Sequence, residues 1–396
     1  MNARRPAMTA AVTSADTGRW RSRSHRRQSA FEASAPGLAL TAPTLGVSHQ
    51  SMSPPSPAGP NGPVMALGIG ACRRTIRVVG IGEVTLPPMY ERPPRPLAMA
   101  RWTVTQFLWW QGGLWIAVGI VAWNWLTPSL ESFATPAAWA VALVYVRNVA
   151  LMIAVAGGLH WWLFIRRSQG TRHKYDERWL SVGRRPFLFR NQTRDNVFWS
   201  LASACSIAAL YESLMLWLYA NDLIWTVPAS GSLLALGYTA ALTLLIFPLG
   251  SVHFYANHRL LHTKHLYRWA HSLHHRNVNI GPWSGVSMHP LEHVLYLSAP
   301  LMFLLIPANP YLITLTTTYF LLSPAVSHSG FDRFVTAGSR TVAGGDRFHT
   351  LHHRYFDCNY GTALVPLDKW FGTFHDGSQE ATEMVKHRRQ LADRGR

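Results

Sequence analysis

Four apolar runs, each long enough to cross a lipid bilayer as a helix, most strongly restrict the fold of this chain of 396 residues. A hydrocarbon core about 30 Å thick requires about 20 apolar residues in helical form. Charged residues make up only 14% of the chain, which favours an integral membrane protein over two or three soluble domains. The predicted spans lie at 103–126, within 137–165, at about 198–220 and at about 233–254.

The charges of the connecting segments predict the orientation of these spans. Segment 166–197 contains nine Lys or Arg residues, whereas segments 127–136 and 221–232 contain none. Because cytoplasmic loops are enriched in Lys and Arg, segment 166–197 is predicted to be cytoplasmic. The net charge of +18 is concentrated in such flanks and in the N-terminal tail, so no nucleic-acid partner is expected.

An apolar stretch from Val294 to about Val326 is interrupted by IPANP at 306–310. Each arm is about 20–24 Å long as a helix, which is short for a complete crossing. We therefore predict a membrane-inserted helical hairpin that turns at Pro307 and Pro310, with two complete spans as the alternative. The predicted fold is all-α: four transmembrane helices, this hairpin and a cytoplasmic, histidine-rich helical cap.

The segments outside the spans differ in composition. Residues 1–95 are rich in Pro, Ser and Arg, with 12 basic and 4 acidic residues, and are predicted to be disordered. A start of translation at Met89 or Met99 is an alternative interpretation. Segment 96–232 is predicted to hold the N-terminal transmembrane helices, and 378–396 to be a charged C-terminal tail.

Two charged residues lie inside the predicted spans, Arg147 in the second and Glu212 in the third. Counted from the non-cytoplasmic ends, they lie at similar depths, roughly 15 and 12 Å. An isolated charge in hydrocarbon is costly, so the two are predicted to pair across adjacent helices in a structural role. A contact with a proton or a substrate is the alternative.

Histidine is concentrated in the segment from His253 to His275, HFYANHRLLHTKHLYRWAHSLHH, which contains seven of the nineteen histidines. The chain holds the spacing HxxxH once in this segment, and HxxHH at 271–275 and again at 349–353. In a helix these spacings place imidazoles on a common face. Neutral imidazole is a common ligand of transition metals, and eight or more exceed the coordination of one ion. The pattern predicts a site for two metal ions.

The three motifs HRLLH, HSLHH and HTLHH, in this order among membrane spans, resemble the fatty acid hydroxylase superfamily, also called the sterol desaturase family, including its bacterial members. WSGVSMHPLEH, SHSGFD and NYGTALVPLDKWFGTFHDG add to the resemblance, which covers about residues 240–377. It implies that 233–377 is a catalytic domain with two iron ions, that O2 is the co-substrate, and that a lipid is hydroxylated or desaturated. Zinc can also occupy such a site on purification.

The resemblance also assigns residues to the site. The implied metal ligands are His258, His262, His271, His274, His275, His328, His349, His352 and His353. The candidates for further ligands or for partners of the ligands are His289, His293, Asp346, Asn359, Glu292, Asp332 and Asp357. Some members carry another histidine four or five residues after the position of His328, where this chain has Asp332 and Arg333. The remaining histidines His160, His253 and His265 are interpreted as interfacial or surface residues, and Cys358 as a small buried residue.

The chain shows no signature of flavin, NAD or haem attachment, so electrons are expected from a separate ferredoxin or cytochrome-like protein. The lipid substrate is expected to enter from the bilayer. Tyr255, Trp269, Trp283, Tyr296 and Tyr360 are candidates for the walls of its channel or for interfacial anchors. The alternatives are a membrane cytochrome with histidine-ligated haem and a metal-binding or metal-transport protein. The substrate, the oxidised position and the choice between alcohol and alkene stay open.

Overall fold

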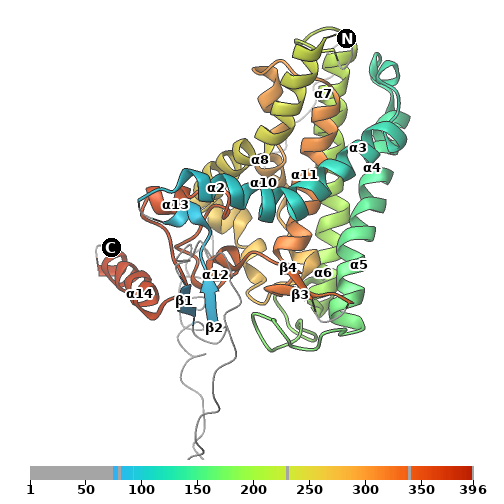
Figure 1. Ribbon diagram of the computed structural model, residues 1–396. Helices are drawn as coiled ribbons and strands as arrows, with labels where there is room; N and C mark the ends of the chain where they lie inside the picture. Colours follow the sequence, from blue (N-terminus) through green and yellow to red (C-terminus); the bar gives the residue numbers. More distant parts are fainter. Residues whose placement is uncertain (1–74, 79–81, 92, 229–231, 338–339, 395–396) are drawn as a thin grey trace, which may run out of the picture. The chain divides into compact units, whose positions relative to one another are not determined.

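Four long apolar helices form the scaffold of the computed structural model, which describes residues 75–78, 82–91, 93–228, 232–337 and 340–394 (Figure 1). Within these residues, four helices are long and apolar enough to cross a membrane: Pro96–Leu126, Ala138–Ile165, Gln192–Ala220 and Leu233–Leu261. They contain the four predicted spans, and the predicted fold class is confirmed.

Three of these helices contain turns of π-helix between α-helical parts. The first consists of α2 (Pro96–Trp102), η2 (Thr103–Gly112), α3 (Gly113–Val121) and η3 (Ala122–Leu126). The second consists of α4 (Ala138–Met152), η5 (Ile153–Gly157), α5 (Gly158–His160) and η6 (Trp161–Ile165). The third consists of α6 (Gln192–Trp199), η8 (Ser200–Ala204) and α7 (Cys205–Ala220), and the fourth is α8 (Leu233–Leu261).

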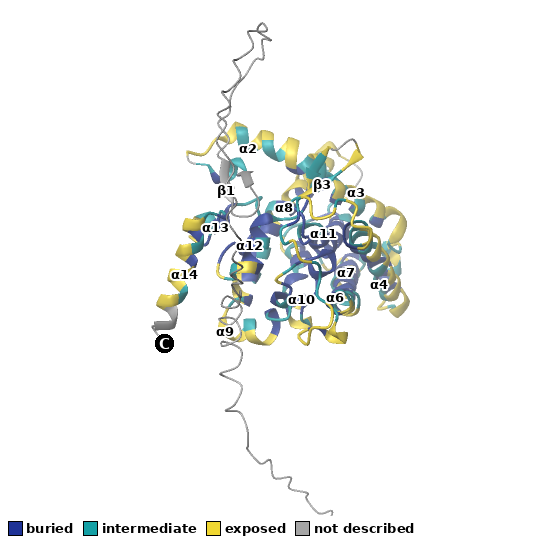
Figure 2. Ribbon diagram, turned by 90° about the horizontal axis from the view of Figure 1, so that it is seen from below, coloured by how far each residue is buried: buried dark blue, intermediate teal, exposed yellow. Residues whose placement is uncertain are grey.

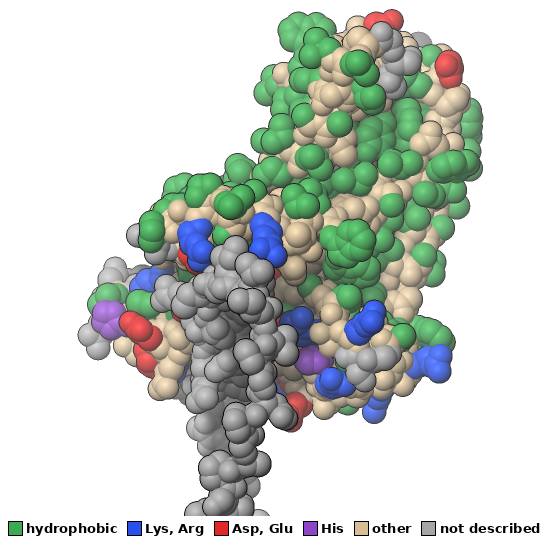
Figure 3. Space-filling model, in the orientation of Figure 1, with side chains coloured by type: hydrophobic (Ala, Val, Ile, Leu, Met, Phe, Trp, Pro, Cys, Tyr) green, Lys and Arg blue, Asp and Glu red, His purple; other side chains and the backbone are tan. Residues whose placement is uncertain are grey.

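The outer faces of these helices are apolar. Large hydrophobic side chains such as Trp109, Leu143 and Leu210 are exposed. Figure 3 shows hydrophobic side chains over much of the visible surface of the helices. A continuous exposed apolar surface of this kind is suited to contact with lipid.

The predicted hairpin is present, but its two arms differ. The first arm is broken into α10 (Pro290–Tyr296) and the 3-10 helix η12 (Ala299–Leu304), and the second is the continuous α11 (Tyr311–Ser327). Most of α11 is buried, and Figure 2 shows it surrounded by other elements. The turn pairs with the segment that follows α7: Val227 N donates to Ala308 O at 3.0 Å. The hairpin therefore extends to the connection between α7 and α8.

A cap of short helices covers the opposite end of the bundle. It contains α9 (Lys264–Leu266), η9 (Tyr267–His271), η10 (His274–Arg276), η11 (Pro282–Ser284), α12 (Arg347–Tyr355), α13 (Leu367–Trp370) and α14 (Gln379–Arg394). The basic connection after the second helix, with η7 (Leu188–Arg190), lies at this end: Tyr175 N donates to Gly330 O at 3.0 Å, and Asn279 Nδ2 donates to Arg178 O at 2.9 Å. The connection after the first helix contains η4 (Leu130–Phe133).

Two small antiparallel hairpins were not predicted. One joins β1 (Thr75–Val78) to β2 (Gly82–Thr85), and the other joins β3 (Arg333–Val335) to β4 (Thr341–Ala343). The first hairpin and η1 (Pro88–Tyr90) lie near the end of the segment 1–95, which was predicted to be disordered. Tyr90 is buried, with its ring 5.3 Å from that of Phe348. Composition alone does not reveal such anchoring contacts. Residues 1–74 lie outside the described residues.

The predicted charge pair forms between two helices inside the bundle. Arg147 on α4 donates to both carboxylate oxygens of Glu212 on α7, with an Nη1–Oε1 distance of 2.9 Å. Thr127 Oγ1 accepts from Arg147 at 2.7 Å, and Thr314 Oγ1 on α11 donates to Glu212 at 2.7 Å. Both charged side chains are buried, so the pair joins three elements inside the apolar region.

Candidate metal centre

The nine histidines predicted as metal ligands converge in two groups at the capped end of the bundle. Within each group, one ring nitrogen from every histidine lies within 4.8 Å of those of the others. Cluster A contains His258, His262, His271, His275 and His352, and cluster B contains His274, His328, His349 and His353.

The HxxHH spacing divides each triplet between the two clusters. In the first triplet, His271 and His275 enter cluster A and His274 enters cluster B. On α12 the order is reversed, because His349 and His353 enter cluster B and His352 enters cluster A. The first and last histidines of HxxHH are four residues apart and share one helix face, whereas the middle histidine directly precedes the last one and lies on an adjacent face. The HxxxH pair at the end of α8 completes cluster A, and His328 after α11 completes cluster B.

The outer nitrogens of several rings have hydrogen-bond acceptors that fix the position of the ring proton. His258 Nδ1 donates to Tyr360 O and His352 Nδ1 donates to Cys358 O, each at 2.6 Å. His271 Nδ1 lies 2.7 Å from Glu292 Oε1. In a neutral ring with the proton on Nδ1, the Nε2 atom carries a lone pair. The inward-facing Nε2 atoms of these rings are therefore suited to accept a metal ion.

The spacing of the inward nitrogens supports this interpretation. The Nε2 atoms of His258 and His271 are 3.1 Å apart, and those of His275 and His352 are 3.0 Å apart. Lone pairs that face one another repel unless a cation lies between them. Two imidazoles bound at right angles to one ion about 2.1 Å away would have nitrogens about 3.0 Å apart. The geometry of cluster A thus fits a bound metal ion.

Cluster B has the same local arrangement. The Nε2 atom of His353 is 3.2 Å from the Nε2 atoms of His328 and His349. His328 Nδ1 lies 3.0 Å from Pro324 O. The Nδ1 atoms of His274, His349 and His353 are buried without a hydrogen-bond partner among the described residues. Cluster B therefore offers four imidazoles to a second ion.

Burial keeps these histidines neutral. Desolvation lowers the pKa of His271, His274 and His275 well below the ordinary value of 6.5, and neighbouring imidazoles lower it further. The same causes lower the pKa of His349, His352 and His353, and burial lowers the pKa of His328 to about 3. Since the neutral ring is the form that binds metal, both clusters are ready to bind at neutral pH.

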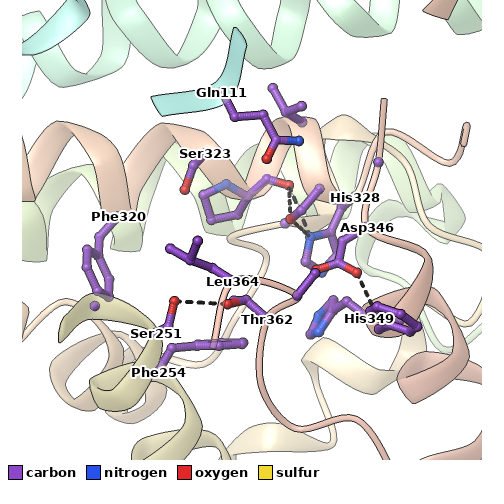
Figure 4. A pocket seen from close by; sticks show the side chains of 18 of the residues that line it. Gln111, Ser251, Phe254, Phe320, Ser323, His328, Asp346, His349, Thr362 and Leu364 are labelled. Carbon is purple, nitrogen blue, oxygen red and sulfur yellow. Dashed lines mark hydrogen bonds between the residues drawn. The ribbon is translucent and has the colours of Figure 1, made fainter. Parts of the chain in front are cut away.

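A cavity of about 460 Å³ adjoins both clusters. His258 and His271 from cluster A line it together with His274, His328 and His349 from cluster B. Its other walls are largely apolar and contain Phe107, Trp115, Phe254, Tyr296, Tyr319 and Phe320. Figure 4 shows His328, Asp346 and His349 at one end of the view and Phe320 at the other. The cavity brings an apolar surface next to the candidate metal centre.

Two of the candidate partners contact ligand histidines. Glu292 contacts Nδ1 of His271 in cluster A. Asp346 is the N-cap of α12, where its Oδ1 accepts from the backbone N of His349 at 3.1 Å. Burial raises the pKa of Asp346 to about 6. Asp332 instead pairs with Arg347, and Asp357 pairs with Arg389 at the surface.

The other candidates lie outside both clusters. His289 caps α10, where its Nδ1 accepts from Leu291 N at 3.2 Å. The ring of His293 lies between Ser203 Oγ and Val286 O, at 2.8 and 3.0 Å, so both of its nitrogens have partners. Asn359 binds the backbone on either side of it, donating to Phe348 O and His375 O. The HP motif at 289–290 therefore forms a helix start and contributes no nitrogen to the clusters.

The structure also tests the interpretations of single residues outside the motifs. His265 is exposed, as predicted, but His253, predicted to be a surface residue, is partly buried and lies 2.9 Å from Ser298 Oγ. Cys358 is buried, and its carbonyl supports His352. Of the five aromatic residues proposed for a channel wall, Tyr296 lines the cavity. The sequence interpretation missed Gln111, Phe254 and Ser323, which also line it, and the glutamine within an apolar run was the available signal.

Comparison with known proteins extends these observations. Residues 243–373 match the profile of the fatty acid hydroxylase family. The chain is 24% identical over 159 residues to the Delta(7)-sterol 5(6)-desaturase ERG3B of Gibberella zeae, covering 40% of this chain and 49% of that protein. It is 33% identical over 155 residues to the very-long-chain aldehyde decarbonylase GL1-8 of Oryza sativa subsp. indica, covering 36% and 57%.

A third relative is the Delta(7)-sterol-C5(6)-desaturase of Nicotiana tabacum, 28% identical over 152 residues, covering 36% of this chain and 51% of that protein. The chain thus spans about half the length of the curated relatives that it matches. No solved structure matches the chain.

Proposed function

We propose that this chain is a membrane-bound non-heme di-iron oxygenase that hydroxylates or desaturates a lipid, because residues 243–373 match the profile of the fatty acid hydroxylase family. The observation that carries the proposal is the convergence of nine histidines, in two clusters, beside an apolar cavity. O2 is the proposed co-substrate.

Each cluster is proposed to hold one iron ion. An all-imidazole ligand set is neutral, so these histidines would hold the ion without reducing its positive charge. When bound, the iron pair supplies the activation of O2 and the oxidation of a C–H bond. Zinc binds imidazole strongly, so zinc in a purified sample is compatible with iron in the working enzyme.

The protein's own residues would hold and orient these groups. The carbonyls of Tyr360 and Cys358 and the carboxylate of Glu292 accept from Nδ1 atoms, and such partners fix the ring orientation and tautomer. The aromatic walls of the cavity would exclude water and hold the apolar part of the substrate. A lipid has to reach this cavity from the surrounding bilayer.

We further propose that the clusters face the cytoplasm and receive electrons from a separate ferredoxin or cytochrome-like protein. The basic segment with nine Lys or Arg residues packs at the end of the bundle that carries the clusters, which supports the orientation. Exposed Arg184 and Arg185 in this segment would suit an acidic partner.

The test uses the full chain, purified in detergent and loaded with ferrous iron under anaerobic conditions. Metal analysis is expected to give about two ions per chain. A membrane lipid extract, ¹⁸O2 and a reductant are then added, and mass spectrometry compares the lipids with a sample that lacks reductant. We expect an ¹⁸O-labelled alcohol or a new double bond that depends on both O2 and the reductant.

Two variants separate the site from the rest of the histidine-rich run. His275→Gln removes a member of cluster A, and His265→Gln changes an exposed histidine of the same run. The first is expected to lose metal and activity, and the second to keep both. Equal metal content in the two variants, or an intense Soret band from bound haem, would contradict the proposal.

A further inference from the structure

A glutamine in the middle of the first membrane-crossing helix has no polar partner. Gln111 belongs to η2, and its side chain lines the cavity. Among the residues that the structure describes, it has no hydrogen bond or ion pair. A polar side chain at membrane depth is costly, so a glutamine amide that faces a cavity indicates a binding function.

Ser323 on α11 is a second such residue. Its side chain also lines the cavity, and within the described part of the chain its hydroxyl has no hydrogen-bond partner. Helical serines commonly bond the carbonyl four residues earlier, so an unpaired hydroxyl is available to a ligand. Figure 4 shows Gln111 and Ser323 on one side of the cavity, with Ser251, Phe254 and Thr362 on the other.

The helix crossing explains why these residues share one side of the cavity. Gly119 on α3 packs directly on Leu315 of α11, where a Cβ atom on the glycine would lie 2.6 Å from Leu315 Cδ1. Gln111 lies eight residues before this contact and Ser323 eight residues after it. Each residue therefore lies about 12 Å along its own helix from the crossing, and both side chains line the cavity.

The surroundings favour a neutral ligand group over an ionised one. Phe107, Trp115, Tyr319 and Phe320 form this part of the wall. Two arginines line the cavity: the charge of Arg347 is balanced by an ion pair with Asp332 at 3.0 Å, although its Nε and Nη1 have no hydrogen-bond partner among the described residues, and Arg333 donates to Thr341 at 3.0 Å. An amide and a hydroxyl each donate and accept, which matches an alcohol or a carbonyl oxygen.

We propose that Gln111 and Ser323 form a subsite that binds a neutral hydroxyl or carbonyl group of the lipid substrate and so determines specificity. The proposal rests on the proposed function for the identity of the ligand as a substrate. Ser323 precedes His328 of cluster B by five residues, or about 7.5 Å along the helix. The subsite therefore holds the oxygen-bearing end of the lipid near the candidate metal centre.

The test measures binding of two probes that differ by one oxygen atom, 1-hexadecanol and hexadecane. The full-length protein in detergent receives equal concentrations of both, and native mass spectrometry gives the ratio of the two bound species. The wild-type protein is expected to bind the alcohol about 3- to 10-fold more tightly, which is the effect of one or two hydrogen bonds. Gln111→Leu and Ser323→Ala are each expected to bring the ratio close to one.

Asn124→Leu is the matched control, because it makes a similar change on an exposed face of the same helix, where Asn124 Nδ2 donates to Ile120 O. It is expected to keep the wild-type ratio. An unchanged ratio in Gln111→Leu would overturn the subsite even if the enzyme oxidises lipids. A ratio that falls to one in this variant would support the subsite even if no oxidation were found, so the two proposals fail separately.

Discussion

The outer nitrogen of each clustered histidine determines what the inner nitrogen can bind. Carbonyl acceptors at His258 and His352 place the proton on Nδ1 and leave Nε2 free for metal. His271 differs, because its acceptor is the carboxylate of Glu292, which is buried and lies on a different element. A carboxylate partner raises the basicity of the ring more than a carbonyl does, so Glu292 is expected to strengthen the metal site.

Replacing this carboxylate tests its contribution. Glu292→Gln keeps the size of the side chain but replaces the carboxyl group, whose pKa burial raises well above its ordinary value, with an amide, so we expect metal affinity to fall about 10- to 100-fold. Competition with a chelator of known affinity measures the change. Glu383→Gln is the control, because Glu383 pairs with Lys386 on the surface of α14. Equal affinities in the two variants would show that Glu292 has no part in the metal site.

The depressed pKa values of the clusters predict how the metal-free protein responds to acid. In the folded state the pKa of His271, His275 and His353 is well below 6.5, whereas in the unfolded state it returns to about 6.5. Below pH 6.5 the unfolded state therefore binds more protons, and stability falls as the pH falls. Above pH 6.5 these groups add no pH dependence.

For each histidine the loss is about 1.4 kcal/mol per pH unit between 6.5 and its folded pKa. We expect the thermal midpoint of chelator-treated protein in detergent to be constant from pH 8 to 7 and to decrease steeply from pH 6.5 to 5.5. His275→Gln should make this decrease shallower. A midpoint that does not change down to pH 5.5 would be inconsistent with buried neutral histidines.

At the scale of one residue, the sequence spacing of the histidines predicts which side chains come together better than it predicts the groups that surround them. The spacings HxxxH and HxxHH were sufficient to select eight of the nine clustered histidines, because helical periodicity fixes which side chains share a face, whereas His328 was assigned only from the family resemblance. The carbonyl of Cys358 and the cavity-lining Gln111 depend on long-range packing instead. His289 and His293 were predicted as possible ligands or partners of ligands, but they lie outside both clusters, where His289 caps α10 and the ring of His293 contacts Ser203 and Val286.

At the scale of elements, a buried ion pair ties the central hairpin to the bundle. Arg147 on α4 and Glu212 on α7 contact each other, and Thr314 brings α11 into the same network. Breaking a buried pair leaves an uncompensated charge, whereas removing both charges can be nearly neutral. The pair is therefore expected to specify how these three helices pack.

A double-mutant cycle tests this role. Arg147→Met and Glu212→Leu are each expected to destabilise the protein by about 3–5 kcal/mol, and the double variant by clearly less than the sum. Thermal or denaturant unfolding in detergent measures the difference. Full additivity of the two effects would mean that the ion pair has no energetic coupling. Metal content should be retained in the double variant, because neither residue contacts a cluster.

The elements themselves were predictable to different degrees. The length and hydropathy of the apolar runs were sufficient to predict the four spans, and the positions of Pro307 and Pro310 were sufficient to predict the hairpin turn. Its broken first arm was not predictable, because apolar composition does not distinguish α-helix from 3-10 helix. The two β-hairpins have strands of only three or four residues, too short for a periodic signal.

At the scale of the whole molecule, the two ends of the described helical bundle differ in charge and chemistry. The basic connection and both histidine clusters lie at one end. At the other end, the hairpin turn at Ala308 pairs with the connection after α7, and that connection contains no Lys or Arg. Under the proposed function, this asymmetry predicts that the compartment facing the basic connection supplies electrons to the clusters.

Cysteine labelling of intact cells tests the predicted orientation. Cys205 and Cys358 are buried, so in a Cys72→Ser background a new surface cysteine is the reactive one. Glu131→Cys lies in the exposed connection without Lys or Arg, and Arg184→Cys lies in the exposed basic one. A membrane-impermeant maleimide is expected to label the first variant in intact cells and the second only after permeabilisation, because the positive loop is retained inside. The opposite pattern would place the clusters outside and exclude a cytoplasmic electron donor.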